Sequence, residues 1–223
     1  AIARLLLESG YTVSGSDRAL TPFAEEVRKA GASVYVGHHA RNVAGADWVV
    51  RSSAIPDDNP EVQAALQKNI PVYKRADFLG ELMAEKTGIA IAGAHGKTTT
   101  TAMTAWVLTE LKRDPSFIIG SVAKNLGVNA RAGTGNLFVI EADEYDNMFL
   151  GLKPQIEVIT NLEHDHPDFF PTFEAMTQSF ETFVNLLPAN GTLIVCMEDA
   201  GAVSLIPHAR KAGKNVVAYG AHM

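Results

Sequence analysis

A glycine-rich segment at residues 93–98 contains the residue types that bind phosphate. It reads Gly93-Ala94-His95-Gly96-Lys97-Thr98 and joins an apolar run, residues 89–93, to an expected helix, residues 98–112. Glycines let backbone N–H groups face an anion, a helix start adds positive potential, and a lysine reaches the terminal phosphates of a nucleotide. Ile91 stands where the full G-x-x-x-x-G-K-[ST] pattern has its first glycine, so the match is to a shortened variant. The alternative is a glycine-rich turn with an exposed lysine.

An acidic cluster follows another apolar run, residues 137–141, which is typical of a buried strand. The run ends in Glu141, and Asp143, Glu144 and Asp146 come directly after it. Mg²⁺ prefers one or two carboxylates together with phosphates, water and a loop hydroxyl such as that of Thr98. The position after a buried strand favours a magnesium ligand at Glu141 over a solvated acidic loop.

A third polar cluster, residues 161–168, follows an expected strand at residues 157–160. It holds His164 and His166 among three carboxylates, which could form a transition-metal site. The remaining ligands of a closed zinc site are not evident, because the only cysteine, Cys196, is distant in sequence. A surface turn with incidental histidines is the alternative. Because all three clusters follow strands, we expect them to meet at the carboxyl edge of one sheet.

The elements that must position these clusters form two series of strands and helices. Repeated strand and helix units of this length predict parallel sheets in an α/β fold with two domains and a boundary near residues 85–88. Thr21 and Asn59, each followed by proline, are expected helix caps. Expected strands are residues 11–15, 33–36, 48–52, 70–73, 89–93, 116–119, 137–141, 157–160, 192–196 and 215–219, and the longest helices are residues 98–112 and 172–187.

The composition limits the class of protein. The chain has 223 residues, 47% of them hydrophobic and 20% charged, with a formal net charge of -6, which is typical of a globular protein and excludes disorder. No apolar run approaches the roughly 18 residues of a membrane span, and no broad basic surface is available for nucleic acid. A single cysteine excludes an intrachain disulfide and fits a reducing cytoplasm, where we expect the protein to act.

The two ends of the chain predict a fragment. Residues 1–7 carry a helical pattern without an initial methionine, and the last residues follow an expected strand, 215–219. We therefore expect the first strand of the first domain to precede Ala1 and the second domain to be incomplete.

Several motifs together resemble the Mur ligase family. They are residues 93–101, 141–146 and 160–166, supported by residues 14–17, 52–55 and 129–131. The resemblance covers essentially the whole chain. It implies a partial Rossmann-like UDP-sugar domain at residues 1–86, then a partial P-loop-type α/β ATPase domain at residues 87–223, with the amino-acid-binding domain of the family outside this chain.

The resemblance also implies roles for individual residues. It places Lys97 on the β- and γ-phosphates of ATP, Thr98 and Glu141 on one Mg²⁺, and His166 on a second. Gly93, Gly96 and Thr99 complete the phosphate cradle, and Ala94 stands where the family usually has Thr or Ser. The residues implied for the UDP-sugar are Asp17, Ser53, Asn129 and Arg131.

The implied activity is ATP-dependent joining of L-alanine to UDP-N-acetylmuramate through an acyl phosphate, a step of peptidoglycan synthesis. Sister ligases carry a carbamylated lysine about fifteen residues after the histidine, whereas residues 172–188 contain no lysine, as in the alanine-adding branch. A tripeptide-recycling ligase shares the same motifs. Two non-ligase alternatives also remain, a nucleotide-driven switch protein and a dinucleotide-binding first domain with Asp17 on a ribose hydroxyl. The sequence predicts no oligomeric state.

Overall fold

The computed structural model describes residues 1–221, which fall into two compact units. The first comprises Ala1–Phe78 and Ala130–Ala132, and the second begins at Leu79 and includes the remaining residues. The division lies inside helix α4 (Arg75–Ala84), earlier than the boundary near residues 85–88 expected from the sequence. The aromatic ring of Phe78 packs on Trp48 in the first unit, with ring centroids 4.7 Å apart, which explains why the first unit extends into the helix.

Short parallel strands form the sheets of the first unit. β1 pairs with β2, and β3 pairs with β4, each pair making a two-stranded sheet. A single parallel sheet was expected for this unit. The helices of the first unit are capped as predicted, since the Thr21 hydroxyl accepts the Ala24 N–H and the Asn59 side chain accepts the Glu61 N–H. The elements are α1 (Ile2–Glu8), β1 (Ser14–Asp17), α2 (Pro22–Lys29), β2 (Ser33–Val36), the 3-10 helix η1 (Ala40–Val43), β3 (Val49–Arg51), α3 (Pro60–Gln67) and β4 (Val72–Lys74). The two-residue strand β7 (Ala130–Arg131) groups with this unit.

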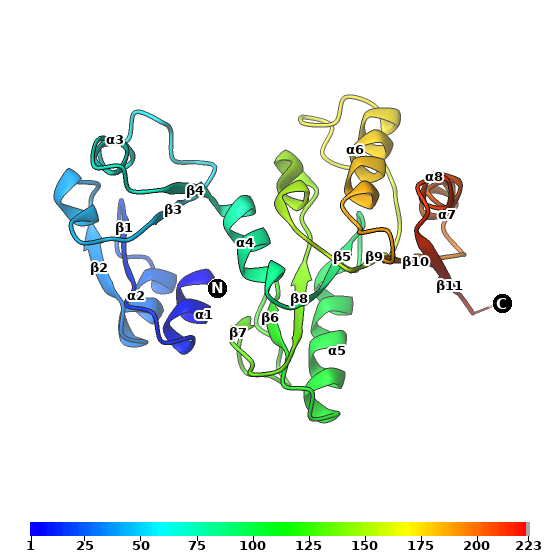
Figure 1. Ribbon diagram of the computed structural model, residues 1–223, viewed down its shortest axis with the longest axis horizontal. Helices are drawn as coiled ribbons and strands as arrows, with labels where there is room; N and C mark the ends of the chain where they lie inside the picture. The colour runs from blue at the N-terminus through cyan, green and yellow to red at the C-terminus, as the bar shows by residue number, and fades with distance from the viewer. Residues whose placement is uncertain (222–223) are drawn as a thin grey trace. The chain divides into compact units, whose positions relative to one another are not determined.

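The second unit is built on a parallel sheet whose strands run in the order β11-β10-β9-β5-β8-β6 (Figure 1). β9, β10 and β11 are neighbours both in the chain and in the sheet, whereas β5 lies between β8 and β9. Parallel pairing needs crossover connections, and helices supply several of them. The elements after α4 are β5 (Thr87–Ala92), α5 (Lys97–Glu110), β6 (Ser116–Ile118), β8 (Leu137–Glu141), the 3-10 helix η2 (Tyr145–Gly151), β9 (Ile156–Ile159), α6 (Phe173–Asn185), β10 (Thr192–Cys196), α7 (Ala200–Ser204), α8 (Ile206–Lys211) and β11 (Asn215–Tyr219).

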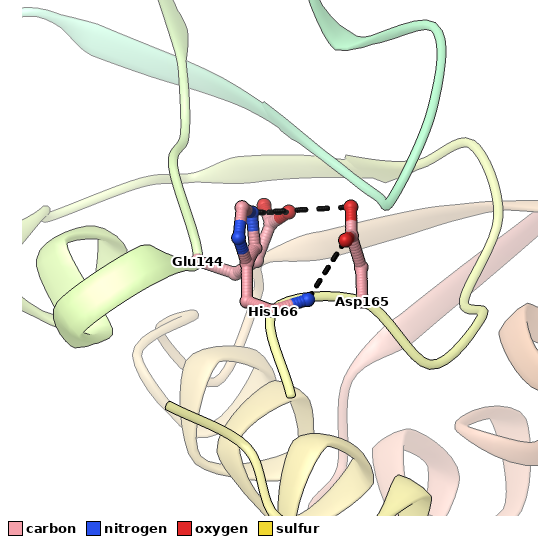
Figure 2. Close-up of side chains that lie close together, drawn as sticks. All are labelled: Glu144, Asp165 and His166. Atoms are coloured by element: carbon pink, nitrogen blue, oxygen red, sulfur yellow. Dashed lines mark hydrogen bonds and ion pairs between the residues drawn. The ribbon is translucent and has the colours of Figure 1, made fainter. Parts of the chain in front are cut away.

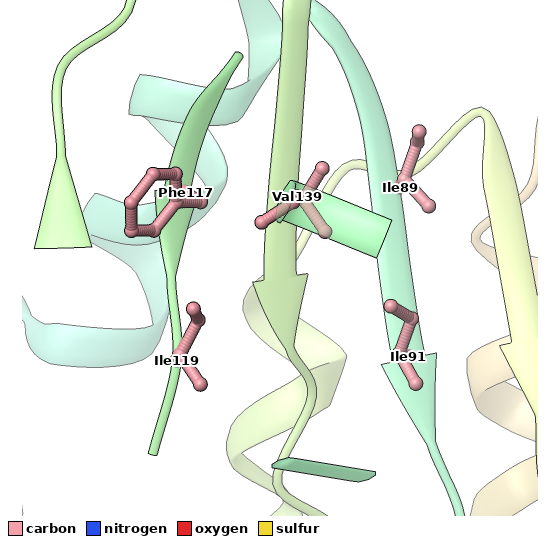
Figure 3. Packing of buried hydrophobic residues seen from close by; sticks show 6 residues of the cluster. Ile89, Ile91, Phe117, Ile119 and Val139 are labelled. Carbon is pink, nitrogen blue, oxygen red and sulfur yellow. The ribbon is translucent and has the colours of Figure 1, made fainter. Parts of the chain in front are cut away.

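One face of this sheet is closed by α5. Figure 3 shows Ile89 and Ile91 of β5 and Val139 of β8 pointing to the same side, where they share a buried cluster with Ala105 of α5. Alternate residues of a strand point to opposite faces, and the interiors of β5 and β8 are apolar at every position, as expected where both faces are covered. This packing fixes the start of α5 beside the ends of β5 and β8.

An aromatic cluster fixes the segment that follows β8. Phe149 of η2 stacks on Phe183 of α6 with centroids 4.5 Å apart and meets Phe180 edge-on at 5.2 Å. All three rings are fully buried.

No helix within residues 1–221 is long and apolar enough to cross a membrane.

Candidate functional site

The segment from residue 93 to residue 98 forms a tight loop between β5 and α5. Gly93 and Gly96 adopt positive φ angles of 136° and 81°, which residues that carry a Cβ atom rarely adopt. A Cβ atom on Gly93 would lie 2.2 Å from the Thr160 hydroxyl oxygen, so a glycine is also required sterically. Gly96 caps α5, whose N-terminus therefore opens directly from the loop. This is the local geometry that suits an anion.

Two residues after β9 brace this loop. The side-chain oxygen of Asn161 accepts the His95 N–H at 2.8 Å, and its amide group donates to the His95 carbonyl at 3.0 Å. The Thr160 hydroxyl donates to the same carbonyl at 2.7 Å. Both residues lie in a motif noted in the sequence, where no role was assigned to them. Their bracing role depends on β9 being the direct neighbour of β5 in the sheet.

Lys97 lies between the loop and a buried carboxylate. Its Nζ donates to the Gly93 carbonyl and to Glu144 Oε1, both at 2.7 Å. The Glu144 side chain is completely buried, and its other oxygen, Oε2, has no hydrogen-bond partner among the described residues. Burial raises the pKa of Glu144, while the hydrogen bond from Lys97 acts in the opposite direction. Glu144 is therefore a buried acid of the site in addition to Glu141, the residue expected from the sequence.

Thr98 and Glu141, which are expected to share one cation, are in direct contact. The Thr98 hydroxyl donates to Glu141 Oε1 at 2.8 Å, and the Gly120 N–H donates to Oε2 at 2.6 Å. Glu141 is the register partner of Ile91, so it ends its strand beside the loop that follows β5. The neighbouring residue Thr99 is exposed at the start of α5.

His166 is grouped with two carboxylates from different segments (Figure 2). Its Nε2 lies 3.9 Å from Glu144 Oε1 and 3.9 Å from Asp165 Oδ2, and one ligand atom of each residue falls within a 4.8 Å group. The structure thus brings together the acidic run after β8 and the histidine cluster after β9. His164 is directed elsewhere, since its Nε2 lies 2.8 Å from the Phe170 carbonyl oxygen.

These residues fit a divalent cation. Mg²⁺ is bound at about 2.0–2.1 Å, so two of its ligand atoms lie at most roughly 4.2 Å apart. The ligand atoms of Glu144, Asp165 and His166 all lie within 4.8 Å of one another, which is close to this limit. The unpartnered oxygen of buried Glu144 is an additional unused acceptor. Thr98 and Glu141 offer a second oxygen pair beside the phosphate loop.

The residues expected to bind a UDP-sugar come from three segments of the chain. Asp17 ends β1, where its carboxylate accepts the Arg18 N–H at 2.6 Å, and Ser53 lies in an exposed turn after β3. The Asn129 carbonyl accepts the Ile119 N–H, and Arg131 lies in β7. Their binding role stays a prediction.

Comparison with known proteins adds a family assignment to this geometry. Residues 1–87 match the description "Mur ligase family, catalytic domain", and residues 91–223 match "Mur ligase middle domain". The UDP-N-acetylmuramate--L-alanine ligase of Renibacterium salmoninarum is 48% identical over 219 residues, which are 98% of this chain and 47% of the relative. The chain thus spans about half the length of the curated relatives it matches.

Solved structures give the same result. The UDP-N-acetylmuramate:L-alanyl-gamma-D-glutamyl-meso-diaminopimelate ligase from Neisseria meningitides matches with a TM-score of 0.86 and 30% identity, over 97% of this chain and 72% of its own. The UDP-N-acetylmuramate-alanine ligase from Thermotoga maritima matches with a TM-score of 0.82 and 28% identity, over 100% of this chain and 50% of its own. With a middle-domain match that alone spans more than half of its residues, the chain belongs to the Mur ligase family.

Proposed function

We propose that the whole protein is an ATP-dependent ligase that joins L-alanine to UDP-N-acetylmuramate in peptidoglycan synthesis. Residues 1–86 would form a Rossmann-like UDP-sugar domain and residues 87–223 a P-loop-type ATPase domain. The observation that carries the proposal is the convergence of Lys97, the Thr98 and Glu141 pair, and His166 around one phosphate loop. The similarity to alanine-adding ligases at 44–48% identity supports the choice of amino acid.

The proposed reaction has two steps. The lactyl carboxylate of UDP-N-acetylmuramate takes the γ-phosphoryl group of ATP, which gives an acyl phosphate and ADP. The amine of L-alanine then attacks the acyl carbon, and an amide and inorganic phosphate result. Phosphoryl transfer needs positioning and charge neutralisation more than covalent help from the protein. Bound Mg²⁺ would supply part of that neutralisation.

The residues of this chain would hold and orient the reacting groups. The backbone N–H groups of the phosphate loop and the start of α5 would bind the phosphates. The Lys97 ammonium would exchange its present contacts with Gly93 and Glu144 for phosphate oxygens. Thr98, Glu141 and His166 would hold the cations. The protein is expected to act in the cytoplasm, where ATP is available.

A second substrate preference is favoured by one observation. A tripeptide-adding ligase has a high structural similarity, with a TM-score of 0.86. Its 30% sequence identity is well below the 44–48% of the alanine-adding relatives, so we place it second.

Phosphate release by the whole protein tests the proposal. We expect release from ATP only when UDP-N-acetylmuramate and L-alanine are both present. A preference for the tripeptide would change the assignment to the recycling ligase, and robust hydrolysis without either acceptor would favour a nucleotide-driven switch protein.

The variant His166→Ala tests the metal role. It should lower kcat by about a hundredfold or more, because a charge-neutralising contact is lost. His164→Ala is the matched control, and it should be much milder because His164 contacts the Phe170 carbonyl instead. Equal kcat values for the two variants would contradict the assignment.

A further inference from the structure

The ring of Tyr145 lies beside the imidazole of His166. The two rings meet in a T-shaped arrangement with centroids 4.9 Å apart. The Tyr145 hydroxyl donates to Asp168 Oδ2 at 3.0 Å, which joins the segment after β8 to the segment after β9. The ring of Phe169 also lies near that of Tyr145, with centroids 5.7 Å apart. Tyr145 therefore bridges the two chain segments that supply Glu144 and His166.

The backbone of His166 is held by hydrogen bonds within its own segment. Its φ angle is 54°, in the left-handed region that residues other than glycine adopt only when the surrounding structure holds them there. The His166 carbonyl accepts the N–H groups of Phe169 and Phe170 at 2.9 and 2.8 Å, and the His166 N–H donates to Asp165 Oδ1 at 2.7 Å. All three hydrogen bonds hold the main chain and leave the imidazole ring free to rotate.

The contacts of the imidazole ring itself are few. Its Nε2 lies 3.9 Å from the nearest oxygens of Glu144 and Asp165, beyond hydrogen-bonding distance. The side chain is about one-third exposed, at 36%, so packing alone does not fix its rotamer. The Tyr145 ring is the aromatic surface against which it rests.

We propose that Tyr145, held by its hydrogen bond to Asp168, is a positioning residue that sets the orientation of the His166 imidazole toward Glu144. The inference rests on the proposed function insofar as His166 binds a cation. It goes beyond that function because neither Tyr145 nor Asp168 needs to touch the cation or the substrates.

Mn²⁺ binding to the whole protein tests the positioning role, with free Mn²⁺ measured by electron paramagnetic resonance. Tyr145→Phe keeps the ring and loses the hydroxyl, and Asp168→Ala loses the acceptor. Each should weaken Mn²⁺ binding about threefold to tenfold, the effect of one hydrogen bond. The double variant should bind Mn²⁺ as tightly as either single variant, because both substitutions remove the same hydrogen bond. Asp168→Asn retains an acceptor oxygen and should restore most of the affinity.

A spectroscopic measurement gives a second readout that does not depend on metal or activity. In protein labelled at histidine and tyrosine, we expect a nuclear Overhauser effect between the Tyr145 and His166 rings. This effect should be lost in Asp168→Ala and kept in Asp168→Asn. Tyr35→Phe, which changes an exposed tyrosine of the first unit, is the control for both measurements.

The outcomes separate the two proposals. Unchanged Mn²⁺ affinity in Tyr145→Phe and Asp168→Ala, together with a persistent ring contact, would overturn the positioning role. If His166→Ala binds Mn²⁺ as the parent does, the cation role in the proposed function fails. In that case the contact between the Tyr145 and His166 rings alone decides the positioning role. Loss of this contact in Asp168→Ala supports the role, and persistence of the contact overturns it.

Discussion

Replacement of Glu157 should stabilise the second unit. Glu157 lies in β9, between β5 and β10, and is completely buried. Both of its carboxylate oxygens lack a hydrogen-bond partner among the described residues. Lys214, which attracts it, donates its own hydrogen bond to the Leu187 carbonyl. Burial raises the pKa of Glu157 well above its ordinary value of 4.5, so folding favours the neutral form of this acid.

The magnitude follows from two costs. Burying a polar group without a partner costs about 1–3 kcal/mol in proteins, which Glu157→Met should recover. The unfolded chain releases the proton above the ordinary pKa while the folded protein keeps it, so the parent loses stability as pH rises. The free energy of unfolding should fall by about 1.4 kcal/mol per pH unit from this group, until pH passes the raised pKa of the folded state.

Chemical denaturation in a Trp48→Phe background provides the assay. Trp106 is then the remaining one of the two tryptophans and lies on α5, in the same unit as Glu157. The difference in unfolding free energy between Glu157→Met and its parent should widen as pH rises above 4.5, the ordinary pKa of the carboxyl group. Glu110→Met, which changes an exposed carboxylate of α5, should give a small difference that does not vary with pH. A constant difference for Glu157→Met would refute the claim that the folded protein buries a neutral carboxyl group.

Two further predictions concern the phosphate loop. Gly93→Ala should lower the unfolding free energy of the second unit by about 3 kcal/mol or more, because a Cβ would lie 2.2 Å from the Thr160 hydroxyl oxygen. The Cβ in Gly96→Ala meets no atom within 4 Å, so this variant should cost about 1 kcal/mol for its positive φ alone. Similar costs for the two variants would contradict the steric argument. Asn161→Ala should raise the KM for ATP in the whole enzyme about threefold to tenfold, because the loop loses both hydrogen bonds to His95, and Asn215→Ala, remote from the loop in the sequence, should leave it unchanged.

Local patterns were sufficient to predict most elements. The strands β2, β8, β10 and β11 have the predicted bounds, because each is a short apolar or β-branched run between turn residues. α5 and α6 end within two residues of the predicted ranges. No helix was expected at α4, because its interior glycine, Gly80, lowers helix propensity. The Gly80 backbone lies against that of Gly151, so tertiary packing explains both the glycine and the helix.

The candidate site was only partly predictable. The phosphate loop is a contiguous motif, and the Thr98 and Glu141 pair follows from two adjacent parallel strands. The choice of Glu144 as the buried acid could not be read from the sequence, because four acidic residues lie within six positions, 141–146. Burial there depends on the left-handed backbone at Asp146 and Asn147, which redirects the chain after β8.

The strand pairing of the first unit has a consequence for self-association. β1, β2, β3 and β4 are all edge strands, since each has one hydrogen-bonded neighbour within residues 1–221. Open edges are templates for pairing between molecules, and charged residues oppose such pairing. β3 and β4 end in Arg51 and Lys74, whereas β2 carries no charge and exposes Tyr35 and Val36. Aggregation of this chain at high concentration should therefore begin at β2, and Val36→Lys should delay it.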